Sequence, residues 1–114
     1  MNTLGGEAEN VAAIYLQQKG LKLLERNYQS RYGEIDLIMQ SGKTLVFVEV
    51  RLRSSGSFGG AAMSVTPTKQ QKIIKTASQY LQKHGNANCR FDVILMTKPS
   101  EDGIEWIPNA FDAS

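Results

Sequence analysis

The chain has very little of the residue types that build disulfides, zinc sites and catalytic triads. Its 114 residues include one cysteine, Cys89, and one histidine, His84. A single cysteine excludes an internal disulfide and a zinc site made of cysteines, and this scarcity fits a reducing, cytoplasmic compartment. A single histidine at the end of an expected helix offers no catalytic triad.

Long apolar runs are missing too. No stretch approaches the roughly 20 apolar residues that a membrane-spanning helix needs, and the start, MNTLGGEAENVAAIYL, lacks the basic opening and apolar block of a signal peptide. We therefore expect no membrane association. With 41% hydrophobic and 21% charged residues, the composition is that of a globular protein, and the length predicts a single domain over residues 1–114. A net charge of +2 allows a nucleic-acid-binding surface only where basic residues cluster.

The hydrophobic pattern predicts seven helices and strands. Helices are expected over residues 3–19 and 68–84, the second with Thr66 or Thr68 as its N-cap. Strands are expected over residues 21–28, 34–40, 44–53, 90–97 and 104–107. A Gly/Ser-rich loop covers residues 54–65. The order α-β-β-β-α-β-β predicts an α/β sandwich, with a central mixed sheet flanked by helices.

Two of the expected strands, GEIDLIMQ and TLVFVEVRLR, form a hairpin around a Ser-Gly-Lys turn. A two-residue loop at Gly42-Lys43 would place Asp36 opposite Glu49 and Glu34 opposite Arg51. A shifted loop would change the partners but leave the faces unchanged, because side chains alternate along a strand. One face is then wholly apolar: Ile35, Leu37, Met39, Val46, Val48, Val50 and Leu52. The other face is apolar near the turn and charged at the open end: Ile38, Leu45 and Phe47, then Glu34, Asp36, Glu49, Arg51 and Arg53.

Asp36 and Glu49 suggest a metal site. Carboxylates that face each other across a ladder repel and destabilise the sheet, so their pairing favours a cation between them. Mg²⁺ commonly takes one or two protein carboxylates and keeps water or phosphate as its other ligands. Such an ion activates water and polarises a phosphodiester.

A structural role for the same acids stays open. In that interpretation Glu34 pairs with Arg51, while Asp36 caps a turn or pairs with Arg31 or Arg53. Acids on neighbouring strands commonly form a solvated rim, since charged side chains are mostly exposed. The chain would then be a protein-interaction domain that binds neither magnesium nor DNA.

Several segments together resemble one known family. GEIDLI, FVEVRLR, FGGAAMSVTPTKQQKI, CRFDVI and EWIPNAFD resemble the YraN-like family of uncharacterised bacterial proteins, nearly throughout the chain from Gly6-Glu7 onward. That family is assigned to the restriction-endonuclease-like superfamily, which includes Holliday-junction resolvases. The resemblance implies a restriction-endonuclease-like sandwich and a nuclease that uses Mg²⁺ or Mn²⁺ on DNA or branched nucleic acid.

The resemblance also implies roles for four residues. The superfamily pattern is an acid on one strand and acid-x-lysine on the next; Asp36 and Glu49 match the acids, and Arg51 occupies the lysine position. Glu7 matches a helix glutamate that approaches the metal in resolvase-like members, although an acid in a first helical turn also suits the helix dipole. Arg51 cannot act as a base, but it can clamp a phosphate or stabilise its charge. This departure keeps open a non-catalytic nucleic-acid-binding protein on a degenerate nuclease scaffold.

A nucleic-acid surface is expected beside these acids. Helical spacing puts Lys69 and Lys72 on one side of the second helix, near Arg51 and Arg53. Phe58 in the Gly-rich loop would stack on an exposed base. Lysines on a helix are commonly just a solvated face, and a plain flexible loop explains the same glycines. Without a base-reading pattern, we expect structure-selective or nonspecific binding, with DNA as the partner.

The C-terminal part offers mainly structural candidates. Asp92 in RFDVI is expected to pair with Arg90 or a backbone turn, and Cys89 to be buried. Trp106 and Phe111 are expected to cover the core near the C-terminus. An apolar surface there would support a homodimer.

Overall fold

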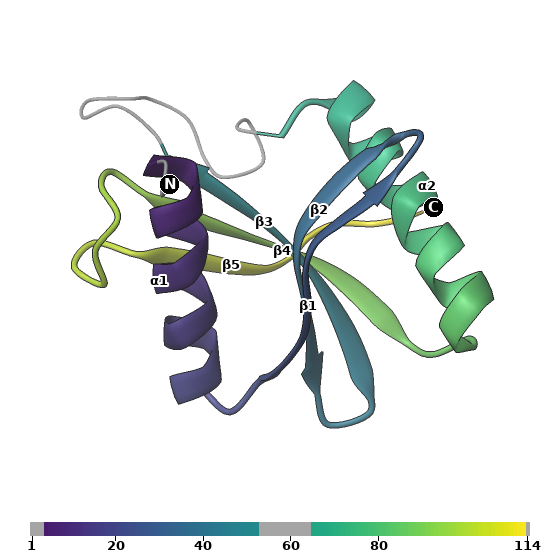
Figure 1. Cartoon of the computed structure of the whole chain (residues 1–114), viewed down its shortest axis with the longest axis horizontal. Helices are drawn as coiled ribbons and strands as arrows, with labels where there is room; N and C mark the ends of the chain where they lie inside the picture. The colour runs from purple at the N-terminus through teal and green to yellow at the C-terminus, as the bar shows by residue number, and fades with distance from the viewer. Residues whose placement is uncertain (1–3, 53–64, 114) are drawn as a thin grey trace.

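The computed structural model describes residues 4–52 and 65–113, in which a five-stranded mixed sheet lies between two helices (Figure 1). The elements are α1 (Leu4–Gln18), β1 (Lys22–Ser30), β2 (Gly33–Ser41), β3 (Thr44–Leu52), α2 (Pro67–His84), β4 (Cys89–Met96) and β5 (Glu105–Phe111). The predicted α/β sandwich and its α-β-β-β-α-β-β order are confirmed. Within these two segments, no helix is long and apolar enough to span a bilayer.

The sheet has the strand order β1-β2-β3-β4-β5. Only β3 and β4 run parallel, and α2 lies in the crossover between them. The two helices lie on opposite sides of the sheet (Figure 1). This topology brings the start of α2 back to the end of β3, where the charged residues of the hairpin lie.

The hairpin has the register expected for a two-residue loop. Ser41 pairs with Thr44, and the ladder continues to Leu37 opposite Val48. Gly42 in the loop has φ 60°, a conformation that glycine adopts without strain. The described ladder ends at Leu37, so the predicted Asp36–Glu49 and Glu34–Arg51 pairs are not ladder pairs.

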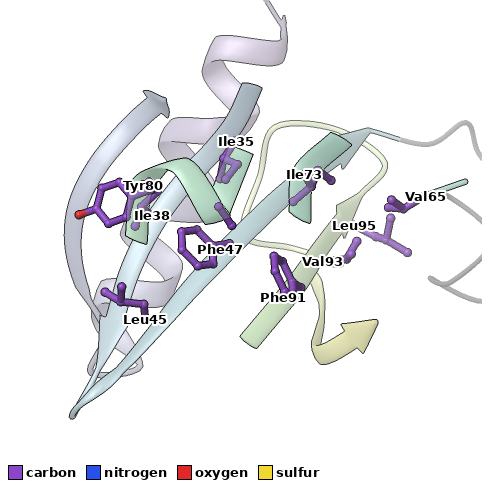
Figure 2. Packing of buried hydrophobic residues seen from close by; sticks show 11 residues of the cluster. Ile35, Ile38, Leu45, Phe47, Val65, Ile73, Tyr80, Phe91, Val93 and Leu95 are labelled. Carbon is purple, nitrogen blue, oxygen red and sulfur yellow. The ribbon is translucent and has the colours of Figure 1, made fainter. Parts of the chain in front are cut away.

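Two apolar clusters occupy the two sides of the sheet. The cluster beneath α2 is built around Phe47, which packs against Tyr80 and Phe91 (Figure 2). The cluster beneath α1 has no aromatic ring among its fully buried described members, which are Ala8, Ala12, Ala13, Leu16, Leu21, Leu37, Met39, Val46, Val48, Ile94 and Met96. The wholly apolar hairpin face therefore packs mainly against α1.

Ile35 does not follow the predicted alternation, and Leu52 is not part of the packed apolar face. Ile35 was expected on the face of Leu37, but it is buried in the cluster beneath α2 (Figure 2). Regular pairing with β3 has ended before Ile35, and Asn27 on the neighbouring strand has φ 52°, outside the β region. Leu52, at the end of β3, is exposed rather than packed under α1.

Helix α2 begins at a well-formed cap. Thr66 Oγ1 accepts a hydrogen bond from the backbone N–H of Lys69 at 3.2 Å, and Pro67 occupies the first turn. The helix ends at Gly85, whose N–H donates to Leu81 O at 2.8 Å. Its buried side chains are Ile73, Thr76, Ala77 and Tyr80. With this face on the sheet, the first turn of α2 stands beside the open end of the hairpin.

Candidate active site

A pocket of about 420 Å³ lies where the open end of the hairpin meets the start of α2. Asp36 on β2 and Glu49 on β3 both line it. Its remaining lining residues come from the β1–β2 turn, the start of β2, and the N-cap and first turns of α2: Tyr32, Gly33, Glu34, Thr66, Thr68, Lys69, Lys72 and Ile73. Strand alternation had already placed the two acids on one face. In the pocket they meet two lysines from a distant part of the chain, Lys69 and Lys72.

Asp36 is buried, with 9% of its surface exposed. Its Oδ2 accepts a hydrogen bond from the backbone N–H of Val50 at 2.8 Å. The side chain thus bonds a backbone donor of β3 that lies beyond the end of the β2–β3 ladder. Burial, and next the charge of Glu49, raise the Asp36 pKa to about 8, although the Val50 bond lowers it. This carboxyl group is held where its charge is costly.

Glu49 is also buried, with 5% exposed, and it has a partner from α2. Lys69 Nζ lies 3.4 Å from Glu49 Oε1. Burial raises the Glu49 pKa, while the charges of Lys69 and Arg51 lower it. A hydrogen bond with Asp36 also lowers the pKa of Glu49, so the two carboxyl groups are in contact.

Two buried polar atoms lack a hydrogen-bond partner in the described part of the chain. They are Glu49 Oε2 and Arg51 Nε. Buried polar atoms are nearly always hydrogen-bonded, and exceptions at a pocket commonly mark where a ligand, an ion or water binds. Both atoms belong to the acid-x-basic segment of β3.

The carboxylate of α1 whose charge reaches Asp36 is Glu9. After Glu49, the carboxylates whose charge raises the pKa of Asp36 are Glu9 and Glu34. Glu9 Oε1 accepts a hydrogen bond from Asn27 Nδ2 at 2.9 Å, which ties α1 to β1 near the acids. The predicted Glu7 is exposed in the first turn of α1 and is not among these carboxylates.

The predicted nucleic-acid-binding residues are only partly brought together. Lys69 and Lys72 both line the acid pocket, and Arg51 acts on Glu49 through its charge. Arg53 and Phe58 lie outside the described residues. The basic face of α2 therefore adjoins the acids, as expected, and one of its lysines is an ion-pair partner of an acid.

The family model of the uncharacterised protein family UPF0102 matches residues 8–96. A UPF0102 protein of Methylobacillus flagellatus is 56% identical over 113 residues, which cover 99% of this chain and 100% of that protein. The chain belongs to the UPF0102 family. A UPF0102 protein of Nitrosomonas europaea is 57% identical over 111 residues, covering 96% of this chain and 94% of the relative. UPF0102 is the YraN-like family, so the resemblance read from the motifs is confirmed.

The acid pair of this UPF0102 protein fits a hard divalent ion. Among residues 4–52 and 65–113, no group of three or more His, Cys, Asp or Glu side chains converges as a metal site. Mg²⁺ does not require such a group, because one or two carboxylates suffice when water and substrate phosphate supply the other ligands. Asp36 and Glu49 supply two carboxylates in contact, and Glu49 Oε2 is still without a hydrogen bond.

Two residues of this UPF0102 site were missed in the sequence. Glu9 borders the face of α1 that packs on the sheet, because Ala13, four residues later, is buried in the structure. Tyr32 lines the pocket from the β1–β2 turn, and its place depends on tertiary contacts with α2. No spacing in the sequence indicates those contacts.

Proposed function

We propose that this UPF0102 protein is a magnesium-dependent nuclease that hydrolyses phosphodiester bonds in DNA, including branched DNA, in the cytoplasm. The supporting observation is the burial of Asp36 and Glu49 in contact with each other inside a pocket that contains Lys69 and Lys72. An acid pair that served only as a solvated rim would remain in water, since burying like charges together is costly. A bound divalent cation would offset that cost.

Asp36 and Glu49 would hold Mg²⁺ or Mn²⁺, which supplies a polarised phosphate and a more acidic water when bound. Lys69 Nζ, 3.4 Å from Glu49 Oε1, would orient the attacking water as a charged ammonium group, and the proton of that water would pass to solvent. Arg51 would stabilise the charge that develops on the phosphate. Glu9 would assist from α1 through its effect on Asp36.

The position of Lys69 favours hydrolysis over the alternative of a non-catalytic DNA-binding protein. That alternative rested on Arg51, which stands where the superfamily pattern has lysine. In the structure, Lys69 from α2 brings a lysine amine to the same acid pair. The site therefore has two acids and a lysine, although the lysine comes from α2 and not from position 51, which holds arginine.

The first test is cleavage of labelled single-stranded, duplex and four-way-junction DNA with Mg²⁺ or Mn²⁺. Asp36→Asn and Glu49→Gln are expected to lower the rate by about 100-fold or more, because each removes a carboxylate that acts on the ion and the transition state. Glu101→Gln, an exposed acid outside the pocket, is the matched control and should retain the wild-type rate. Absence of cleavage on all three DNAs with both ions would overturn the proposal, as would full activity of Asp36→Asn.

A second readout does not depend on turnover. Mg²⁺ or Mn²⁺ that binds the folded state raises the Tm in a concentration-dependent manner. We expect this rise in the wild-type protein and in Glu101→Gln, and its loss in Asp36→Asn. Equal Tm shifts in wild type and Asp36→Asn would show that the ion binds elsewhere.

Lys69 has its own prediction. Lys69→Ala should reduce turnover by about 100-fold while weakening DNA binding much less, because the ammonium group orients water and stabilises charge in the transition state. Lys69→Arg keeps the charge but should not restore turnover. Adding Arg51→Lys to Lys69→Ala should recover part of the rate, since it returns an amine to the acid pair from β3. Turnover of Lys69→Ala at the wild-type rate contradicts the assignment.

A further inference from the structure

A second hollow, of about 490 Å³, adjoins the acid pocket along α2. The two share Tyr32, Thr68 and Lys72 as lining residues. A third, smaller hollow of about 240 Å³ continues from Tyr32 and Lys75 along the same helix. We call the second hollow the flanking pocket; it is lined by Arg31, Tyr32, Thr68, Gln71, Lys72 and Lys75.

Tyr32 stands at the centre of these hollows with cations around it. Arg31 Nη2 donates a hydrogen bond to the Tyr32 hydroxyl at 2.9 Å, and the Arg31 guanidinium carbon lies 5.0 Å from the ring centroid. Lys75 Nζ lies 5.3 Å from the same centroid. The Arg31 bond, and next its charge, lower the Tyr32 pKa. The charged lining residues of the flanking pocket are Arg31, Lys72 and Lys75, in a protein whose net charge is only +2.

The turn that carries Tyr32 is fixed against α2. The backbone N–H of Tyr32 donates to Ser30 Oγ at 3.0 Å, and Ser30 Oγ lies 2.7 Å from Thr76 Oγ1 in a hydrogen bond. Thr76 is fully buried and also donates to Lys72 O at 2.9 Å. A part-buried hydrogen bond between β1 and α2 therefore holds the turn that carries Tyr32 against the helix that carries the lysines.

We propose that the flanking pocket binds an unstacked nucleotide of the strand to be cut, with its base against Tyr32 and its phosphate between Lys72 and Lys75. This deepens the proposed nuclease function and rests on it, because the pocket continues into the acid pair. The substrate class is then nucleic acid with unpaired nucleotides at the cleavage site, such as a single strand or the branch of a junction. A base stacked inside a duplex does not reach a side-chain platform, whereas an unpaired base stacks on an aromatic ring.

Single-stranded binding without divalent ions tests the inference separately from cleavage. The probes are fluorescein-labelled 12-nucleotide single strands of DNA and of RNA, and the same DNA as a duplex, all with EDTA. Tyr32→Ala should weaken binding of the single strands by about 5- to 150-fold, the range for losing one base stack. Duplex binding should fall less than twofold. Tyr32→Phe keeps the ring and should stay within about threefold of wild type.

The roles of Lys72 and Lys75 are tested by removing each charge and measuring how single-strand binding depends on salt. Lys72→Ala and Lys75→Ala should each reduce the slope of log K against log[salt] for single strands by about 0.7, one phosphate contact each. Lys83→Ala is the matched control on the same helix, exposed and outside the three hollows. An abasic site placed along the DNA strand should weaken wild-type binding at one position and leave Tyr32→Ala unaffected.

The outcomes separate this inference from the proposed function. Undiminished single-strand binding by Tyr32→Ala, or an equal loss on duplex, overturns the flanking pocket even if Asp36-dependent cleavage is observed. Absence of single-strand binding by the wild-type protein overturns it as well. Tyr32-dependent binding without cleavage would support the pocket and count against hydrolysis. Equal Tyr32 effects on DNA and RNA would assign the pocket to both, and an effect on one alone would name the substrate.

Discussion

Asp36→Asn is expected to be more stable than the wild-type protein at pH 8, although it removes a proposed metal ligand. The folded protein holds Asp36 with 9% exposure beside Glu49, and these surroundings raise its pKa to about 8. An unfolded aspartate has a pKa near 3.9. The asparagine retains an oxygen that accepts the Val50 N–H bond and has no charge to bury. We expect a gain on the order of 2–5 kcal/mol in the free energy of unfolding at pH 8 without divalent ions.

The dependence of this gain on pH has a definite sign. Because the folded pKa lies above the unfolded one, the folded protein binds more protons between about pH 4 and pH 8. Asp36 therefore favours folding most below pH 4, and this contribution is lost as pH rises to 8. The difference between Asp36→Asn and wild type should grow across that window, by at most about 1.4 kcal/mol per pH unit, and level off above it.

Urea unfolding at pH 5, 6, 7 and 8 with EDTA measures this difference. Asp112→Asn is the control, since Asp112 is exposed near the C-terminus and faces water before and after unfolding. Mg²⁺ should narrow the difference between Asp36→Asn and wild type at pH 8, because only the wild type binds the ion at Asp36. A pH-independent difference, or a less stable Asp36→Asn at pH 8, would contradict the electrostatic account. Such a gain in stability is typical of sites where function and stability conflict.

The fold was largely predictable because its signals are local. The turn sequence predicted the hairpin and left two registers open, of which the structure has the one with a Gly42-Lys43 loop, and apolar spacing predicted both helices. The last strand was expected to end at Ile107, but β5 continues through Pro108 to Phe111. It lies at the edge of the sheet, where a proline is tolerated because no further strand needs its N–H. Ile35 was misplaced because alternation assumes regular pairing, which ends at Leu37.

Only the part of the site that lies on one hairpin was predictable from the sequence. Alternation along one hairpin brought Asp36 and Glu49 together. The contact of Lys69 with Glu49 joins residues twenty positions apart through the packing of α2. Helical spacing placed Lys69 on the basic side of α2 but did not predict this contact. Tyr80 was likewise not predicted in the core, although it lies one heptad after Ile73 on the buried face of α2.

The structural role predicted for Asp92 is confirmed. Asp92 is buried among hydrogen-bond donors, whereas Asp36 is buried beside another carboxyl group. Asp92 is 1% exposed on β4 and has its charge satisfied from three directions. Arg90 Nε lies 3.1 Å from its Oδ1, Trp106 Nε1 donates to Oδ2 at 2.9 Å, and the Asn109 N–H donates to Oδ1 at 2.9 Å. These bonds hold β5 against β4 at a residue, Asn109, whose φ of 57° is unusual for a side chain other than glycine.

Asp92→Ala is therefore expected to lower the free energy of unfolding by about 3–5 kcal/mol, because it leaves a guanidinium and two N–H donors without their acceptor. Such a loss is a large part of the roughly 5–15 kcal/mol that stabilises a domain. Urea unfolding, followed by circular dichroism and by the fluorescence of Trp106, the sole tryptophan, measures it.

Asp92→Asn provides the matched comparison with Asp36→Asn. An asparagine at position 92 keeps one acceptor oxygen but presents an amide toward donors, so it should destabilise the protein, by less than alanine does. The same substitution should thus raise stability at Asp36 and lower it at Asp92 at pH 8. Losses below about 1 kcal/mol for Asp92→Ala would contradict this role. The sign of the aspartate-to-asparagine effect distinguishes a carboxylate buried with its partners from one buried against another carboxylate, and only the second would gain stability from a bound cation.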